Sequence, residues 1–161
     1  MAANQTGPVT LRAAVWADHG KLEQLQWRAS LANPGDREAL LAHPEVNELA
    51  PAHIADGRVF VAELADTVLG FAAIAPRADG SFELDALFVE PDHWRRGIGR
   101  LLLDHCCHAA RLAGAAELHV MGNPHARRFY EAGQFEMLGT TPLRFGVGLL
   151  MKRVLSPGPA R

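Results

Sequence analysis

Residues 82–114 read FELDALFVEPDHWRRGIGRLLLDHCCHAARLAG, and this stretch decides the fold. Apolar and acidic residues alternate at its start, which predicts a strand over residues 82–89. Pro91 ends the strand, because proline has no N–H to donate to a neighbouring strand. Apolar residues then recur at helical spacing as far as Gly114, which is placed to stop a helix. The stretch therefore predicts a strand, a tight turn and a helix.

The turn between this strand and this helix is rich in glycine and arginine, and its residues are Arg95, Arg96, Gly97, Ile98, Gly99 and Arg100. Glycine lets the backbone approach a ligand closely and adopt unusual dihedral angles. The first N–H groups of a helix have no internal partner and carry the positive end of the helix dipole. The turn therefore suits a phosphate or pyrophosphate group. Taken by itself, it is equally typical of a solvated basic turn.

Two widespread nucleotide-binding patterns do not fit this turn. The Rossmann pattern needs a third glycine where Leu102 stands, and it normally belongs to the first strand–helix unit of a domain. The phosphate-binding loop of many ATPases needs Gly-Lys followed by Ser or Thr, whereas Arg100 and Leu101 stand here. A Rossmann-like domain is therefore the weakest of the alternatives.

The turn does resemble motif A of the GNAT superfamily of N-acetyltransferases, written Gln/Arg-x-x-Gly-x-Gly/Ala and preceded by a strand that ends near Val-x-Pro. Val89-Glu90-Pro91 and Gly97-Ile98-Gly99 match it. Trp94 stands where the family usually has Gln or Arg. That departure removes one polar side chain and leaves the backbone of the turn unchanged.

A second match lies further along the chain, where residues 123–135 read NPHARRFYEAGQF. They resemble the family's motif B, Asn-x-x-Ala-x-x-Phe-Tyr-x-x-x-Gly-Phe, with Gln134 before Phe135 as a common variation. The resemblance implies an α/β (α+β) fold. Its expected form is a mixed, mostly antiparallel central sheet of about seven strands with helices on both faces.

The remaining patterns follow the family's order of elements. Further strands are expected at residues 9–15, 58–64, 68–75, 116–121, 135–138 and 147–154. Further helices are expected at residues 18–31 with Asp18 as N-cap, 36–53 with an interruption at Pro44, and 125–133. The resemblance therefore extends over nearly the whole chain.

Length and composition limit the classes of protein to consider. The 161 residues predict one domain over 1–161, with residues 1–8 and 156–161 as frayed tails. A net charge of −2 argues against a nucleic-acid partner. The absence of a signal sequence and of any apolar run of about 18 residues argues against a membrane partner, so a cytoplasmic location is expected.

The two cysteines, Cys106 and Cys107, stand between His105 and His108 in the predicted helix. Consecutive helical residues point in different directions, so they converge neither on a disulfide nor on one metal ion. No second pair such as Cys-x-x-Cys occurs elsewhere. We therefore expect no metal site here. We expect a structural helix in which a cysteine side chain is buried.

The resemblance implies acetyl-CoA as co-substrate and direct transfer of its acetyl group to a primary amine. Such a transfer needs a deprotonated amine, a held oxyanion and a proton donor for the departing thiolate. Tyr130 is the chain's one tyrosine, and the family motif places its hydroxyl near the thioester sulfur. We therefore expect Tyr130 to be the general acid rather than a half-buried helical aromatic.

A carboxylate on the 82–89 strand is the expected general base. The family often carries a base near Glu83, usually acting through water, and Asp85 lies on the same strand face as the reserve candidate. Two alternatives stay open at this point. Glu83 is equally typical of a surface residue, and many family members drain the proton along ordered waters.

The resemblance also implies where acetyl-CoA binds. The pantetheine arm is expected beside the backbone of Phe88 and Val89, like an added strand. The pyrophosphate is expected on the main-chain N–H groups of residues 95–100, and Asn123 on the pantetheine side. An Asn before Pro is also an ordinary helix-start residue.

The acceptor is expected between residues 17–53 and the loop at 141–147, which flank the cofactor groove in the family. It is a small-molecule amine or a peptide or protein amine. Three glutamates, Glu38, Glu45 and Glu48, favour a cationic amine, whereas Arg144 favours an acceptor with a carboxylate. Family members often form homodimers. The rival function is a non-catalytic acyl-CoA-binding sensor or scaffold, which has no use for a proton donor beside the sulfur.

Overall fold

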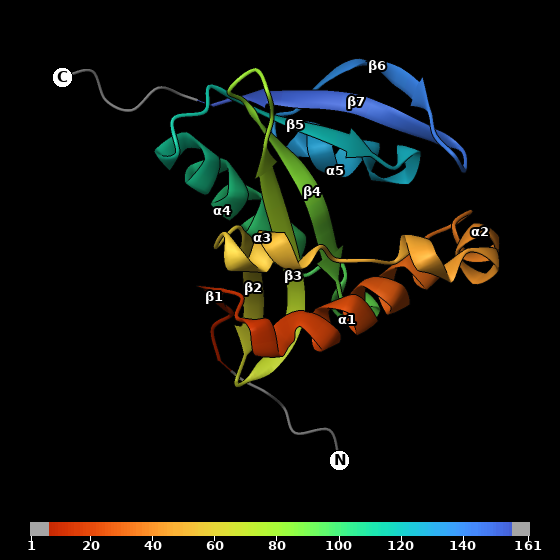
Figure 1. Cartoon of the computed structure of the whole chain (residues 1–161), viewed down its shortest axis with the longest axis vertical. Helices are drawn as coiled ribbons and strands as arrows, with labels where there is room; N and C mark the ends of the chain where they lie inside the picture. Colours follow the sequence, from red (N-terminus) through yellow and green to blue (C-terminus); the bar gives the residue numbers. More distant parts are fainter. Residues whose placement is uncertain (1–6, 156–161) are drawn as a thin grey trace.

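Seven strands form one mixed sheet in the computed structural model, which describes residues 7–155 (Figure 1). The strands are β1 (Thr10–Ala13), β2 (Val59–Leu64), β3 (Thr67–Pro76), β4 (Phe82–Val89), β5 (Glu117–Gly122), β6 (Glu136–Pro142) and β7 (Val147–Val154). Their order across the sheet is β1-β2-β3-β4-β5-β7-β6. Every neighbouring pair is antiparallel except β4 and β5, which are parallel. The mostly antiparallel sheet expected from the sequence is therefore confirmed.

Helices cover both faces of this sheet (Figure 1). Their bounds are α1 (His19–Ala32), α2 (Arg37–Ala42), α3 (Pro51–Ala55), α4 (Ile98–Leu112) and α5 (Arg127–Ala132). Short 3-10 turns precede or join them at η1 (Trp16–Asp18), η2 (Pro44–Val46), η3 (Pro91–His93) and η4 (Pro124–Ala126). α1 and α3 lie on one face, and α4 and α5 lie on the other.

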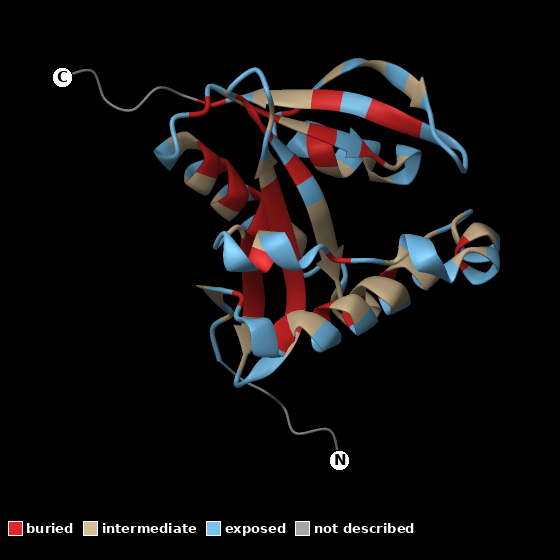
Figure 2. Ribbon diagram, in the orientation of Figure 1, coloured by how far each residue is buried: buried red, intermediate tan, exposed pale blue. Residues whose placement is uncertain are grey.

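Each face has its own apolar core. Strands β2 and β3 are buried along most of their length and supply side chains to both cores (Figure 2). On the α1 and α3 side, Leu22, Leu25 and Ile54 pack on Val61 and Phe71. The larger core on the other face lies beneath α4 and α5. Burial on both faces explains why β2 and β3 read as nearly continuous apolar runs.

The β3–β4 ladder contains a bulge at the centre of the sheet. Ile74 pairs with Leu84 and Ala73 pairs with Ala86, so Asp85 has no partner residue on β3. A bulge of this kind bends a strand and redirects its side chains, and it recurs beside active sites. It changes which side chains of β4 face each core after this point.

The region between α1 and β2 differs from the expected single helix. Instead of one helix interrupted at Pro44, the chain forms α2, the turn η2 and α3. Pro44 and Pro51 each begin a new helical turn, because a proline N–H is not needed at that position. Asp18 precedes α1 as expected, but its carboxylate binds Arg12 and the Val15 amide instead of capping the helix.

Three expectations concern the chain tails, membrane-spanning helices and metal ligands, and the structure bears on them only within residues 7–155. The tails expected at residues 1–8 and 156–161 lie outside the described residues, apart from Gly7 and Pro8, which form no helix or strand. Within residues 7–155, no helix is long and apolar enough to span a bilayer. Over the same residues, no three His, Cys, Asp or Glu side chains gather as metal ligands.

Gly70 offers a test of how closely β3 and β4 approach at the end of β4. A Cβ at Gly70 would lie 2.8 Å from the Phe88 carbonyl oxygen and 3.2 Å from Leu102 Cδ1. We expect Gly70→Ala to lower the free energy of unfolding by about 1–3 kcal/mol, measured by urea denaturation. Gly20→Ala is the matched control, because nothing lies within 4 Å of a Cβ there and alanine favours a helix. Equal stability of the two variants would contradict this tight approach.

Candidate active site

Strands β4 and β5 separate partway along their length. Their parallel pairing extends only over Phe82 with Leu118, Glu83 with His119 and Leu84 with Val120. Beyond this point β4 continues to Val89 and β5 continues to Gly122 without pairing to each other. Their facing edges therefore carry backbone groups without a strand partner across the gap.

A cavity of about 740 Å³ lies at this separation. Its walls come from the separated parts of β4 and β5, the C-terminal end of α1, the turn before α4 and the segment from η4 to α5. Residues of both motifs described above, 95–100 and 123–135, thus contribute to the walls of the cavity. An extended chain of atoms fits between the strands in the manner of an additional strand.

The turn before α4 presents unpaired amides to this cavity. Arg95 and Gly97 both have left-handed backbone conformations, with φ of 63° and 83°. The first helical hydrogen bond runs from the Leu101 N–H to the Gly97 carbonyl. Within the described residues, no amide from Arg95 to Arg100 donates a backbone hydrogen bond. Alternating dihedrals and free amides at a helix N-terminus form a concave anion-binding site.

Gly99 keeps this turn close to its neighbours. A Cβ at Gly99 would lie 3.3 Å from the Phe129 ring, so a larger residue would push α5 away. Gly97 meets nothing within 4 Å, and glycine is needed there for its positive φ. The two glycines therefore have different physical roles in one turn.

The arginines of the turn contribute unequally. Arg95 and Arg100 line the cavity, whereas Arg96 does not. The Arg100 guanidinium donates to the Asp104 carboxylate and to the Ala132 carbonyl, so its charge is largely committed to α4 and α5. The main-chain amides, rather than these guanidinium groups, are the common feature of the turn.

Trp94 links the turn to the end of β4. Its indole N–H donates to the Val89 carbonyl at 2.7 Å. Phe88 and Val89 both line the cavity. Trp94, which stands where the motif usually has Gln or Arg, therefore occupies one acceptor position of the Val89 carbonyl. The sequence showed the substitution but not this contact.

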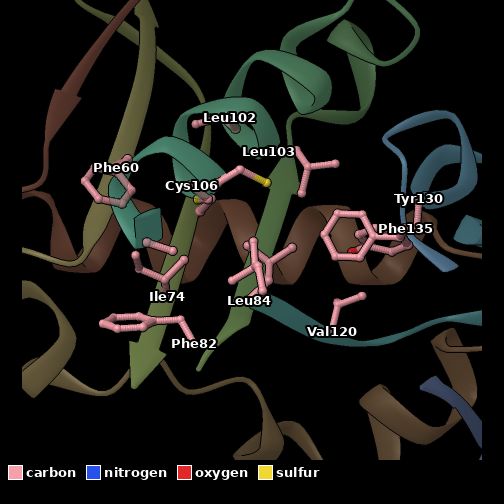
Figure 3. Packing of buried hydrophobic residues seen from close by; sticks show 14 of the residues in the cluster. Phe60, Ile74, Phe82, Leu84, Leu102, Leu103, Cys106, Val120, Tyr130 and Phe135 are labelled. Atoms are coloured by element: carbon pink, nitrogen blue, oxygen red, sulfur yellow. The ribbon is translucent and has the colours of Figure 1, made fainter. Parts of the chain in front are cut away.

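Tyr130 lies in the wall of the cavity and is only 7% exposed. Its ring meets the Phe129 ring edge to face. It meets the Phe135 ring in the same way (Figure 3). A Cβ at Gly122 would come within 3.0 Å of the same ring, so glycine allows Tyr130 to pack against β5. The hydroxyl makes no hydrogen bond to any described residue. Burial raises the pKa of Tyr130 to about 12.

The two candidate carboxylates occupy different positions. Asp85 lines the cavity, and its Oδ2 lies 2.8 Å from Nε2 of His53 on α3. Glu83 is exposed, is paired in register with His119 on β5 and does not line the cavity. The bulge at Asp85 lies between the paired and the separated parts of β4. Of the two, only Asp85 lines the cavity that Tyr130 also lines.

Asn123 also lines the cavity, but both ends of its side-chain amide have protein partners. Its Nδ2 donates to Asp36 Oδ2 at 3.0 Å, and its Oδ1 accepts from the His125 backbone N–H at 2.9 Å. The first contact connects the loop after α1 to the end of β5 across the cavity. Burial raises the pKa of the Asp36 carboxyl above its usual range.

Sequence reasoning did not find His53, Asp36 or the contact of Trp94. His53 and Asp36 each contact a residue far away in the chain, Asp85 and Asn123 respectively, and neither lies in a recognisable motif. Trp94 lies in the first motif, but the motif does not indicate that its indole binds the Val89 carbonyl. The acidic and histidine residues between 36 and 53 were visible only as a charged helical region. No signal in one sequence indicates that His53 reaches Asp85.

Comparisons with known proteins are consistent with this geometry. A sequence model of the acetyltransferase (GNAT) family matches residues 20–134. No match was found among curated protein sequences. The matched residues include the turn before α4 and nearly all of the second motif.

Several solved structures share the fold at low identity. YncA of Salmonella typhimurium, a proposed acetyltransferase solved with its cofactor acetyl-CoA, has a TM-score of 0.71 and 24% identity, covering 96% of this chain and 98% of its own. The PaiA N-acetyltransferase of Thermoplasma acidophilum, in complex with coenzyme A, has a TM-score of 0.75 and 18% identity, with 92% and 99% covered. The ribosomal-protein-S18-alanine N-acetyltransferase of Escherichia coli has a TM-score of 0.68 and 19% identity, with 96% and 99% covered.

Because Tyr130 is the chain's one tyrosine, its ionisation can be measured directly. We expect the phenolate absorbance near 295 nm to rise with a midpoint pKa of about 12 in the folded protein. In guanidinium chloride the midpoint should return to about 10. The free energy of unfolding should fall as the pH rises from 10 to 12, since only the unfolded chain ionises readily there. A midpoint near 10 in both states would contradict the burial of the hydroxyl.

Proposed function

The chain belongs to the GNAT family of acetyltransferases, and on that basis we propose that it transfers the acetyl group of acetyl-CoA directly to a primary amine in a ternary complex. One observation carries the proposal. The gap between β4 and β5 has free helix-start amides at one end and holds both a protonated phenol and a carboxylate in its walls.

The residues present fit acetyl-CoA. The amides from Arg95 to Arg100 suit its pyrophosphate, and the backbone of Phe88 and Val89 borders the gap in which a pantetheine arm would lie. Asn123 borders the same gap, and for that reason we include it among the proposed cofactor-binding residues. Two relatives of the same fold were solved with acetyl-CoA or coenzyme A, which supports this choice of co-substrate. Its thioester supplies an activated acyl group, so no protein nucleophile is required.

Asp85 is the proposed proton acceptor. An amine is a nucleophile only after it loses a proton, and a free alkylammonium has a pKa near 10.4. The Asp85 carboxylate lies in the cavity wall and can take this proton directly or through one water. His53, 2.8 Å away on α3, offers a route from Asp85 toward solvent. Glu83 is the rival candidate and lies two residues before Asp85, where β4 is still paired with β5.

Tyr130 is the proposed proton donor. As the amine nitrogen bonds to the acyl carbon, the carbon–sulfur bond breaks and the sulfur needs a proton. Burial keeps the Tyr130 phenol protonated at physiological pH, and no described residue uses its hydroxyl. Asp85 takes one proton from the ammonium, and the phenol gives one proton to the sulfur. The nitrogen of the new amide gives up its second proton to the Tyr130 phenolate, which restores the phenol. One proton is released overall, and it leaves from Asp85 to water.

Replacing Tyr130 tests the general acid. We expect Tyr130→Phe to lower turnover by roughly 10²–10⁴, measured as thiol release from acetyl-CoA in the presence of an amine. Coenzyme A affinity, measured by calorimetry, should stay within about twofold of wild type, because only a hydroxyl without a hydrogen-bond partner is removed. Undiminished turnover would remove Tyr130 from the mechanism.

Replacing the two carboxylates separately tests the base. We expect Asp85→Asn to lower kcat/KM by roughly 10²–10⁴ and to remove the acidic limb of its pH profile. Glu83→Gln has the same change of charge at a neighbouring position outside the cavity and should cost less than about tenfold. The reverse ranking would assign the base to Glu83. Wild-type profiles in both variants would assign deprotonation to ordered water alone.

A further inference from the structure

Two of the charged residues that pointed to opposite acceptor classes, Arg144 and Glu45, pair with each other in the fold. Arg144, in the turn between β6 and β7, lies with its NH2 group 3.8 Å from Glu45 Oε1 in η2. The same guanidinium lies over the Phe145 ring at 4.9 Å, and His43 stacks on that ring at 4.8 Å. This contact joins the tip of the β6–β7 hairpin to the segment after α2 (Figure 1). Neither Arg144 nor Glu45 is therefore free to select an acceptor carboxylate or a second ammonium.

The lysine of β7 is neutralised in the same way. Lys152 is paired in register with His119 on β5 and with Glu136 on β6. Its ammonium is bonded to Glu117 and lies 3.9 Å from Glu136. A carboxylate on an acceptor would have to break this pairing to reach the Lys152 charge.

An apolar surface, which we call the apolar shelf, extends from the cavity over the sheet and consists of Met121, Leu143 and Leu150. Met121 lines the cavity and is 56% exposed, and Leu150 is its register partner on β7. A Cβ at Gly148 would lie 2.8 Å from Met121 Cγ and 3.2 Å from Leu143 Cδ1, so glycine lets these side chains meet. The shelf is thus continuous with the proposed reaction site.

The opposite face of the same strands is covered. Val120, Leu149 and Met151 alternate with the shelf residues along β5 and β7 and are buried with Tyr130 on the α5 side. Figure 1 shows α5 against this side of β5 and β7. The shelf therefore has the apolar character of a sheet face but, among the described elements, lacks a helix of its own.

The charge beside the shelf is negative. Asp85 lies in the cavity wall, and Glu83 is exposed on the neighbouring stretch of β4. A carboxylate attracts the ammonium group of an acceptor that approaches the thioester. An apolar surface beyond the carboxylate disfavours a second charged group on the same acceptor, because that group would lose hydration. Asp85 and Met121, which directly follow the paired residues Leu84 and Val120, both line the cavity.

We propose that the acceptor is a primary amine carried on an apolar body, with neither a carboxylate nor a second ammonium at its far end. The inference rests on the proposed acetyl transfer and specifies its substrate class. The amine group lies toward Asp85, and the apolar body lies on the shelf formed by Met121, Leu143 and Leu150. Free amino acids and linear diamines are therefore poor acceptors.

Three probes of equal chain length test this proposal: hexylamine, 1,6-diaminohexane and 6-aminohexanoate. They share one primary amine on a six-carbon chain and differ in the far group, which is a methyl, an ammonium or a carboxylate. We expect kcat/KM for hexylamine to exceed each of the others by at least about tenfold, because a charge loses hydration on an apolar surface. The diamine value is halved first, since it has two reactive ends.

A matched pair of variants ties this preference to the shelf. Met121→Gln removes apolar contact at an exposed position and should lower kcat/KM for hexylamine about fivefold, with less than twofold change for the diamine. Leu112→Gln makes a similar change at an exposed position that does not line the cavity, at the end of α4 opposite the anion-binding turn. It should alter neither value. An equal loss for all three probes in Met121→Gln would overturn the role of the shelf.

The remaining outcomes separate this inference from the proposed function. Faster acetylation of 6-aminohexanoate or of the diamine would overturn the acceptor class and leave the transferase intact. Thiol release with none of the three amines, while calorimetry still detects coenzyme A binding, would overturn both the acceptor class and transfer to amines.

Discussion

The separation of β4 from β5 is the feature on which the rest of this structure depends. Two neighbouring parallel strands stop pairing after three residue pairs, in the centre of a seven-stranded sheet. Unpaired backbone N–H and C=O groups away from water are costly, so such a gap persists only where water or a ligand can satisfy them. The gap therefore leaves free strand edges with which the amides of the proposed co-substrate can pair.

The two apolar cores keep this gap in place. On one face, α4 packs across β2, β3 and β4, which holds the turn before α4 against the β4 side of the gap. On the other side of the gap, Tyr130 packs on Gly122 and Phe135, which ties α5 to β5. Asn123 and Asp36 then bridge the gap at its far end. The rigid parts of the molecule thus define the two walls, and polar contacts span them.

The chemistry of the site follows from where burial is complete and where it is not. The Tyr130 hydroxyl lies in an apolar environment that favours its neutral form, which preserves a proton for a departing thiolate. Asp85 lies at a bulge where the strand turns its side chains toward the cavity and toward His53. The proposed acid and the proposed base therefore come from opposite sides of the strand gap, Tyr130 from α5 beside β5 and Asp85 from β4.

Much of this fold was determined by local patterns in the sequence. Alternation, proline and glycine positions located the seven strands, the long α4 and the anion-binding turn, because these features depend on neighbouring residues alone. The two motifs also singled out Tyr130 and the residues of the turn, which the structure brings together around one cavity. Only the tertiary structure decided that Asp85 rather than Glu83 borders the cavity, that His53 contacts Asp85, and that Arg144 and Glu45 neutralise each other. These outcomes depend on a bulge and on contacts between distant elements, and the spacing of residues along a chain does not encode which distant side chains meet.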